Sequence, residues 1–192
     1  MHGTMDSVGT RIAQHAPLNG TSMTTHPVLN AILQRRSIRE FTDAPVDDSL
    51  LHSIIQAGIW APSGLNNQPW RFVIVKDVKT RTLLAAQTSY SHIILASPAL
   101  IVVYLDTREM YDEIKDHQAA GACLQNMLLA VEAYDLGAVW LGQILNNKAA
   151  VNTILALDSN YDLMAVLAIG HPAHHRQRSH RKPLEHFILK KI

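Results

Sequence analysis

A short basic segment contains the first group of side chains suited to chemistry. Arg35, Arg36, Ser37 and Arg39 lie within five positions. Guanidinium groups are permanently charged and offer forked donors, so this spacing suits a phosphate monoester. The same residues are also consistent with a solvated helix end, where charged side chains commonly face water. The segment alone leaves both interpretations open.

A second segment, residues 61–72, reads Ala-Pro-Ser-Gly-Leu-Asn-Asn-Gln-Pro-Trp-Arg-Phe. Its prolines and glycine restrict the backbone path. Ser63, Asn66 and Gln68 bring side chains that both donate and accept hydrogen bonds. Such a rigid loop suits the edge of a flat heteroaromatic molecule such as a flavin. Clusters of Ser, Gly, Asn and Pro are also ordinary turns, and that alternative stays open.

Taken together, the two segments resemble the nitroreductase family of FMN-dependent oxidoreductases, in their order and in their separation. The matching patterns are Arg-Arg-Ser-x-Arg-x-Phe at 35–41, Ala-Pro-Ser-Gly-x-Asn-x-Gln-Pro-Trp-x-Phe at 61–72, Leu-Gly-x-x-Trp-Leu-Gly at 136–142, and Gly-x-Pro at 170–172 followed by Arg-Lys-Pro-Leu-Glu at 181–185. The resemblance covers residues 26–192. It implies an α+β fold with a mixed central sheet flanked by helices, in an intertwined homodimer.

The resemblance also implies the cofactor and its contacts. FMN would be held without a covalent bond by Arg35, Arg36, Ser37, Arg39, Pro62, Ser63, Gly64, Asn66, Leu141, Gly142, Gln143 and Arg181. The first segment would reach the phosphate, the ribityl chain and the pyrimidine side of the ring, and Arg181 would close on the phosphate. The loop would come from the other subunit, and the 141–143 backbone would approach flavin N5. The family often has a second basic residue two positions before the one at Arg181. Here that position is Ser179, so a second phosphate contact would have to come from Arg178 or His180.

The implied reaction is ping-pong electron transfer from NADH or NADPH, through FMN, to a nitroaromatic, a quinone or a similar small molecule. No catalytic side chain is expected, because the flavin itself carries the hydride. Alternatives are a specialised flavin enzyme on the same scaffold (a dehydrogenase, a dehalogenase or a flavin-consuming enzyme) and a non-catalytic flavin-binding or flavin-free dimer, because fold does not settle chemistry. The short connection after Asp106 leaves little chain for a lid and favours an open site.

Apolar periodicity predicts the elements that position these residues. A helix beginning at Pro27 ends near Arg35, and a second helix is capped by Asp47, with Val46 stapled to Leu51. Strands are expected at 72–75, 99–105, 138–141 and 163–169. Polar helix with turns is expected at 77–96, followed after the second strand by a mobile charged connection up to 115. Two further helices are expected at 116–135 and 147–155. Without strict β-α-β alternation or a Gly-x-Gly-x-x-Gly fingerprint, this order favours an α+β fold over a Rossmann domain.

The longest expected helix, 116–135, is apolar over more than half of its circumference. A surface helix needs only one apolar stripe, so this helix is either central to the core or shared with another subunit. The resemblance favours the shared position, because this helix matches the one that builds the family's dimer interface.

The C-terminal segment between His171 and Lys182 is rich in histidine and arginine. His171, His174 and His175 could chelate a metal, but no carboxylate or thiol lies nearby in the sequence and the spacing fits no helix face. We therefore predict no metal site, and instead an anion-binding segment. The apolar residues 187–189 would add a strand to a partner's sheet.

Composition limits the remaining possibilities. At 192 residues with 47% hydrophobic content, the chain can form one domain, expected at 26–192 after a flexible leader at 1–25 that is an extension or a tag remnant. The net charge of +1 argues against nucleic acid and membrane partners. The single Cys123 excludes an internal disulfide. With no secretion signal and no apolar run of about 18 residues, we expect a cytoplasmic protein.

Overall fold

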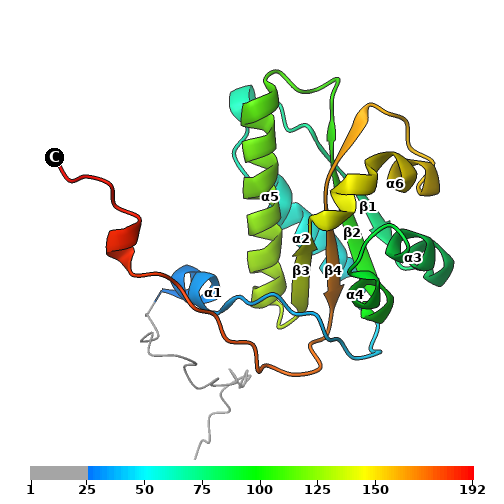
Figure 1. Cartoon of the computed structure of the whole chain (residues 1–192), viewed down its shortest axis with the longest axis horizontal. Helices are drawn as coiled ribbons and strands as arrows, with labels where there is room; N and C mark the ends of the chain where they lie inside the picture. The colour runs from blue at the N-terminus through cyan, green and yellow to red at the C-terminus, as the bar shows by residue number, and fades with distance from the viewer. Residues whose placement is uncertain (1–25) are drawn as a thin grey trace, which may run out of the picture.

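The computed structural model describes residues 26–192, and the predicted leader at 1–25 lies outside the described residues. A four-stranded sheet in the order β1-β2-β4-β3 forms its centre (Figure 1). The strands are β1 (Trp70–Val75), β2 (Ala99–Asp106), β3 (Gly137–Leu141) and β4 (Tyr161–Gly170). Val73 pairs with Val102, which in turn pairs with Val166. All four predicted strands therefore exist.

The prediction of a mixed sheet was wrong for the strands described. All three strand pairings are antiparallel, and the one parallel contact is an isolated bridge between Ser37 and Ala138. Every residue of β2 is buried. An apolar strand of this kind appears wherever both faces of a sheet are covered, so its composition indicates burial and not strand direction.

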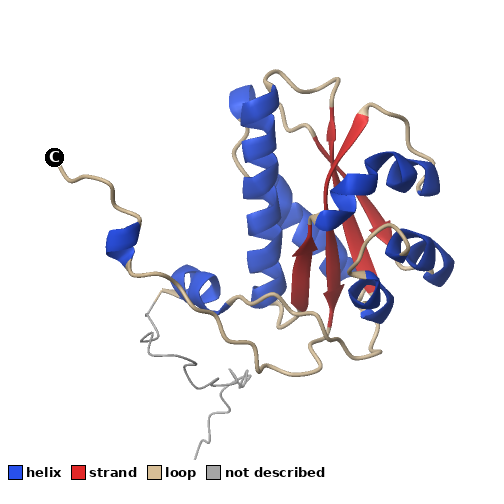
Figure 2. Cartoon of the chain, in the orientation of Figure 1, coloured by secondary structure: helices blue, strands red, loops and turns tan. Residues whose placement is uncertain are grey.

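Helices cover both faces of the sheet, as Figure 2 shows in blue and red. On one face, α2 (Asp48–Ile59) and α5 (Glu113–Ala133) pack through Ile54, Leu124 and Met127 against alternate residues of the strands. On the other face lie α3 (Val78–Ala85), α4 (Ser91–Ala96) and α6 (Lys148–Ile154). The sheet thus separates two apolar layers, and α5 belongs to the core of its own chain.

Helix α5 begins at Glu113, earlier than the expected start near 116. The cause is Asp112, whose side chain accepts a hydrogen bond of 3.0 Å from the backbone N–H of Lys115 and so caps the helix. The expected mobile connection up to 115 is therefore shorter than predicted, and its last residues belong to the capped helix.

Helix α1 (Pro27–Gln34) forms where expected, but none of its residues is buried. Figure 1 shows α1 and the C-terminal segment together on one side, away from the sheet. The predicted cap of α2 is only half right: Val46 is buried with Leu51, but the Asp47 side chain makes no capping hydrogen bond.

Three short 3-10 helices complete the described chain: η1 (Gly64–Asn66), η2 (Gln143–Asn147) and η3 (Leu184–His186). Residues 187–189 form no strand within this chain, so their predicted pairing with a partner stays a prediction. No helix in the described part combines the length and the apolar character needed to cross a bilayer.

Candidate functional site

A basic cluster forms near the C-terminal end of α5. The pKa of Arg35 lies below its usual value because the side chain is half-buried and because the Arg181 and Arg36 guanidinium groups repel its charge. Glu132 of α5 partly offsets this repulsion. Burial raises the pKa of Glu132, whereas both arginines act to lower it. The fold thus brings together the basic residues of two distant segments, and a bound anion would relieve their repulsion.

Arg36 folds back onto the end of α1. Its Nη1 donates to the backbone carbonyls of Leu33 at 2.7 Å, Gln34 at 2.9 Å and Arg35 at 2.9 Å. These are carbonyls that a helix end leaves without partners. The helix-end interpretation is therefore correct for this part of the side chain. The Nε atom of Arg36 is buried and has no hydrogen-bond partner, so one donor remains for a ligand.

Residues 37–41 dock against the start of β3. The backbone N–H of Ile38 donates to the Ala138 carbonyl at 2.9 Å. A Cβ atom at Gly137 would lie 2.8 Å from the Ile38 side chain, so this close approach requires glycine. Arg39 makes only a long bond of 3.4 Å to the Ser37 carbonyl. Backbone bonds and the packed Ile38 and Phe41 side chains position this segment, whereas Arg39 contributes little to its position.

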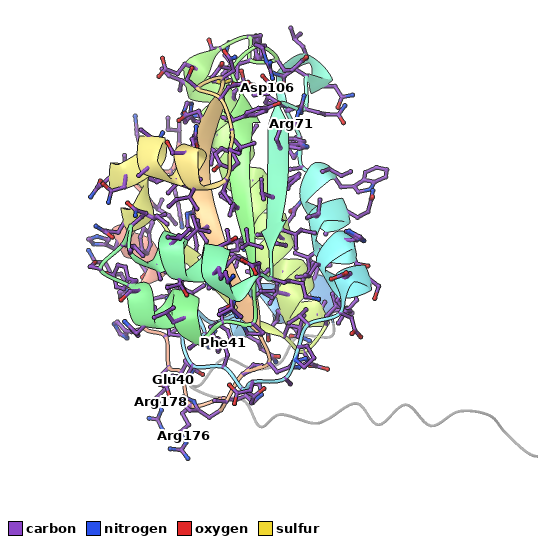
Figure 3. All side chains as sticks on the ribbon, turned by 90° about the vertical axis from the view of Figure 1, so that its right-hand side faces the viewer. Glu40, Phe41, Arg71, Asp106, Arg176 and Arg178 are labelled. Carbon is purple, nitrogen blue, oxygen red and sulfur yellow. The ribbon has the colours of Figure 1, made fainter. Side chains whose placement is uncertain are left out.

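Arg181 is oriented by its own neighbours. Its Nη1 donates to the Ser179 hydroxyl and, at 2.9 Å, to the His180 carbonyl. Ser179 therefore holds Arg181 instead of supplying a second positive charge. Figure 3 shows Arg176 and Arg178 projecting outward at the lower end of the molecule, near Glu40 and Phe41.

The loop 62–69 is held by its own polar groups. The Ser63 hydroxyl accepts from the Gln68 backbone N–H at 3.1 Å, and the Gln68 side chain donates to the Asn66 carbonyl at 3.0 Å. Leu65 has a φ of 52° and is 86% exposed. A leucine in the left-handed region is uncommon, and strain of this kind concentrates at binding sites.

The end of β3 presents bare backbone. A Cβ atom at Gly142 would meet nothing within 4 Å. The neighbouring Leu141 is buried. The side-chain oxygen of Gln143 accepts from the Thr88 hydroxyl at 2.6 Å and from the Ser89 backbone N–H at 3.0 Å. The Gln143 side chain is thus engaged within the fold, and the backbone of 142–143 is what remains for a ligand.

Two parts of the predicted site lie at opposite ends of α5. The loop is bonded to Asp116, in the first turn, whereas the basic cluster lies near Glu132. Sixteen positions separate these residues, which corresponds to about 24 Å along a helix. Within one chain the loop and the basic cluster do not meet. Figure 1 shows the same separation between α1 and the upper end of α5.

A cavity of about 380 Å³ opens beside the start of α5. It is lined by Thr107, Met110, Tyr111, Asp112, Glu113, His117 and Asp162. None of the predicted cofactor contacts lines it. Among the described residues, no group of three or more His, Cys, Asp or Glu side chains could hold a metal ion.

The model of the Nitroreductase family matches residues 32–89 and 80–171. The chain belongs to the nitroreductase family. A crystal structure from Desulfovibrio desulfuricans, determined in complex with FMN, is 51% identical and has a TM-score of 0.85, covering 88% of this chain and 99% of that chain. The NADH dehydrogenase of Thermus thermophilus is 34% identical over 204 residues, 86% of this chain and 98% of the relative. The NADPH-flavin oxidoreductase of Vibrio harveyi is 30% identical, over 81% of this chain and 70% of the relative.

These similarities confirm the predicted family and enzyme class: this nitroreductase is an NAD(P)H-dependent flavin oxidoreductase. Its own residues fit FMN. The buried Nε of Arg36 has no partner, the Arg35 guanidinium is repelled by two others, and the space beside Gly142 is open. Each of these features suits a phosphorylated planar ligand.

The sequence patterns do not identify Tyr111 and Asp116, two residues of this nitroreductase that contact loop 62–69. Tyr111 packs so closely on the loop that a Cβ atom at Gly64 would lie 2.1 Å from the phenol oxygen. Asp116 bonds to the loop from the start of α5. Neither residue belongs to a recognisable pattern, because each reaches the loop only through tertiary structure.

Proposed function

We propose that this nitroreductase binds FMN at the seam between two copies of the chain and passes electrons from NADH or NADPH to a small acceptor. Nitroaromatics, quinones and similar molecules are the proposed acceptors, in a ping-pong reaction. The observation that carries the proposal is the division of the site: a basic cluster at one end of α5 and a rigid amide-bearing loop at the other. Two copies related by a twofold axis can bring one chain's loop to its partner's cluster.

The apolar surface of the chain supports a homodimer. Helix α1 exposes its whole apolar stripe, although such stripes are normally buried. The C-terminal arm adds more exposed apolar side chains: Leu184, Phe187, Ile188, Leu189 and Ile192. Figure 1 shows both segments projecting on the same side. Exposed apolar side chains that gather on one side of a molecule are typical of surfaces that a partner covers.

Names and structures of relatives support the choice of cofactor and donor. FMN is present in the Desulfovibrio desulfuricans structure. The names of two relatives mention NADH and NADPH respectively, so the proposal includes both nicotinamides. A cytoplasmic location stays a proposal, consistent with the single unpaired and buried Cys123.

The chain's own residues would bind and orient the cofactor. Arg35, Arg36 and Arg181 would hold the phosphate by charge-assisted hydrogen bonds. Ser63 and Asn66 would present polar groups to the ring edge, and Gly142 would let the ring approach bare backbone. FMN, when bound, accepts a hydride at N5 and passes electrons on, so no catalytic side chain is required. Positive groups near the ring would favour negative charge there.

The test begins with the colour of the purified protein. We expect a yellow protein whose flavin absorbance is lost on anaerobic addition of NADPH or NADH and returns on addition of a quinone or nitroaromatic acceptor. A yellow protein that is inert to both nicotinamides would favour a specialised flavin enzyme or a binding protein. A colourless protein that ignores added FMN would refute the proposal.

A further inference from the structure

Asp116 is a fully buried carboxylate in the first turn of α5. Its Oδ1 accepts from the Asn67 side-chain amide at 2.8 Å, and its Oδ2 accepts from the backbone N–H groups of Tyr111 at 2.9 Å and Asp112 at 3.0 Å. Burial acts to raise the pKa of this carboxyl, but the hydrogen bonds outweigh it and keep the pKa below its ordinary value. Asp116 is therefore charged and has donors on both oxygens.

These hydrogen bonds join two separate parts of the chain. Asn67 belongs to the loop proposed to meet the flavin, whereas Tyr111 and Asp112 belong to the connection between β2 and α5. Asn67 makes a second bond to the same connection, because its amide also donates to the Glu109 carbonyl at 3.0 Å. The carboxylate and this carbonyl together fix the base of the loop.

The same carboxylate sets the position of the Tyr111 ring. Asp116 holds the Tyr111 backbone, and the ring then lies against Gly64, where a Cβ atom would be 2.1 Å from the phenol oxygen. The Lys115 ammonium lies 5.2 Å from the centre of the ring and supports it by a cation–π contact. Gly64 is a proposed flavin contact, so Tyr111 stands beside the proposed ring site.

We propose that Asp116 is a positioning residue for the cofactor, which clamps Asn67 and Tyr111 and so holds loop 62–69 in the shape that receives the flavin ring. The proposal rests on the proposed function, because it assigns the loop to FMN. Asp116 touches no ligand itself and acts through Asn67 and Tyr111. Its substitution changes cofactor binding because the Asn67 amide loses one of its two acceptors and keeps only the Glu109 carbonyl.

The test is a charge-exchange cycle at positions 116 and 67, read by FMN titration. Asp116→Asn places an amide N–H₂ against the Asn67 amide, and we expect the FMN Kd to rise roughly tenfold. Asn67→Asp places two carboxylates together and should raise the Kd at least as much. The double variant restores a donor facing an acceptor, so part of the affinity should return. A helix-start role for Asp116 alone would show no such recovery.

Hydrogen exchange of the loop amides provides a second readout that needs no cofactor. Asp116→Asn should accelerate exchange in residues 62–69 while the middle of α5 stays protected. If Asp116→Asn does not fold, Asn67→Ala removes the same contact without changing α5. It also removes the bond to the Glu109 carbonyl, so the Kd should rise at least as much. The matched control is Glu113→Ala, which removes the other acidic side chain of the first turn of α5 but leaves the loop contacts in place. Its Kd for FMN should equal that of the wild type.

The outcomes separate the two proposals. A wild-type protein that binds no FMN overturns the proposed function, and this inference with it. A wild type that binds FMN, with Asp116→Asn binding equally well, overturns only the role of Asp116. An equal loss of affinity in Glu113→Ala would also overturn it, because helix stability would then be the cause.

Discussion

Arg36 illustrates how one side chain serves two interpretations of a motif. Its Nη1 satisfies carbonyls at the end of α1, while its buried Nε has no partner. Arg35 would gain from a bound anion, because burial and two neighbouring guanidinium groups disfavour its positive charge. At the scale of single residues, the proposed phosphate site would therefore depend on Arg35 and Arg181, while Arg36 also braces the end of α1.

Replacing Arg181 with Ala should weaken FMN binding by about 1.5–3 kcal/mol, the scale of a hydrogen bond to a charged group. FMN fluorescence titration measures this change. Arg176→Ala is the matched control, because Arg176 lies in the same segment and projects outward (Figure 3). Unchanged affinity in Arg181→Ala would remove this residue from the phosphate site.

Asp106 gives a prediction for the dependence of stability on pH. Hydrogen bonds from Arg108 hold the pKa of Asp106 below its ordinary value, and Arg71 lies 3.7 Å away (Figure 3). A lowered folded-state pKa stabilises the protein above the unfolded value of about 3.9, and this contribution is lost as pH falls through the folded pKa. Asp106→Asn should therefore be less stable than wild type at pH 7, and the difference in the free energy of unfolding should narrow towards pH 3. Urea unfolding at both pH values measures this difference. A difference that stays constant with pH would contradict a lowered pKa for Asp106.

The residue patterns predict the basic groups but not their partners. Arg35 and Arg181 are recognisable from their motifs, and the structure places them close enough to repel each other. Asp116 is not recognisable, because an acidic residue in the first turn of a helix is ordinary. Only the folded chain brings its carboxylate to Asn67. Long-range hydrogen bonds of this kind leave no local signal in a sequence.

At the scale of elements, apolar periodicity predicts where the strands and helices lie, but it does not predict the direction of the strands. The strands and the long helix appear as expected because runs such as 99–105 are apolar throughout and bounded by breakers. The antiparallel order of the sheet was not predictable from those runs, since helices cover both faces. The start of α5 was misplaced because Asp112, not a residue nearer 116, supplies the cap.

The packing of α2 on α5 depends on Gly58. A Cβ atom there would lie 2.7 Å from Met127 Cγ and 3.0 Å from Cys123 Sγ. Gly58→Val should therefore lower the free energy of unfolding by about 1–3 kcal/mol through overpacking. Gln56→Ala, at an exposed position of the same helix, should change it by less than about 0.5 kcal/mol. Denaturant unfolding compares the two variants, and equal stabilities would show that α2 and α5 are not closely packed at Gly58.

At the scale of the whole molecule, the proposed site needs two chains. Leu29 and Ile32 are exposed on α1, so replacing both with Arg should leave the fold of each chain intact while preventing dimerisation. We expect sedimentation to show monomers, and FMN affinity to fall with them because the loop and the basic cluster then lie apart. Leu83→Arg, an exposed leucine on α3, is the control. A double variant that stays monomeric yet binds FMN normally would refute the two-chain site.

The hydrogen bond between Asn67 and Asp116 joins positions 49 residues apart. Closing a segment of this length costs entropy before the contact repays it, so we expect this bond to form late in folding. We therefore expect the loop to reach its final shape after β1, β2 and the start of α5 have assembled. In a refolding experiment, helical circular dichroism should return before the quenching of added FMN. A delay that does not shorten at higher protein concentration would report on loop ordering rather than on the pairing of two chains.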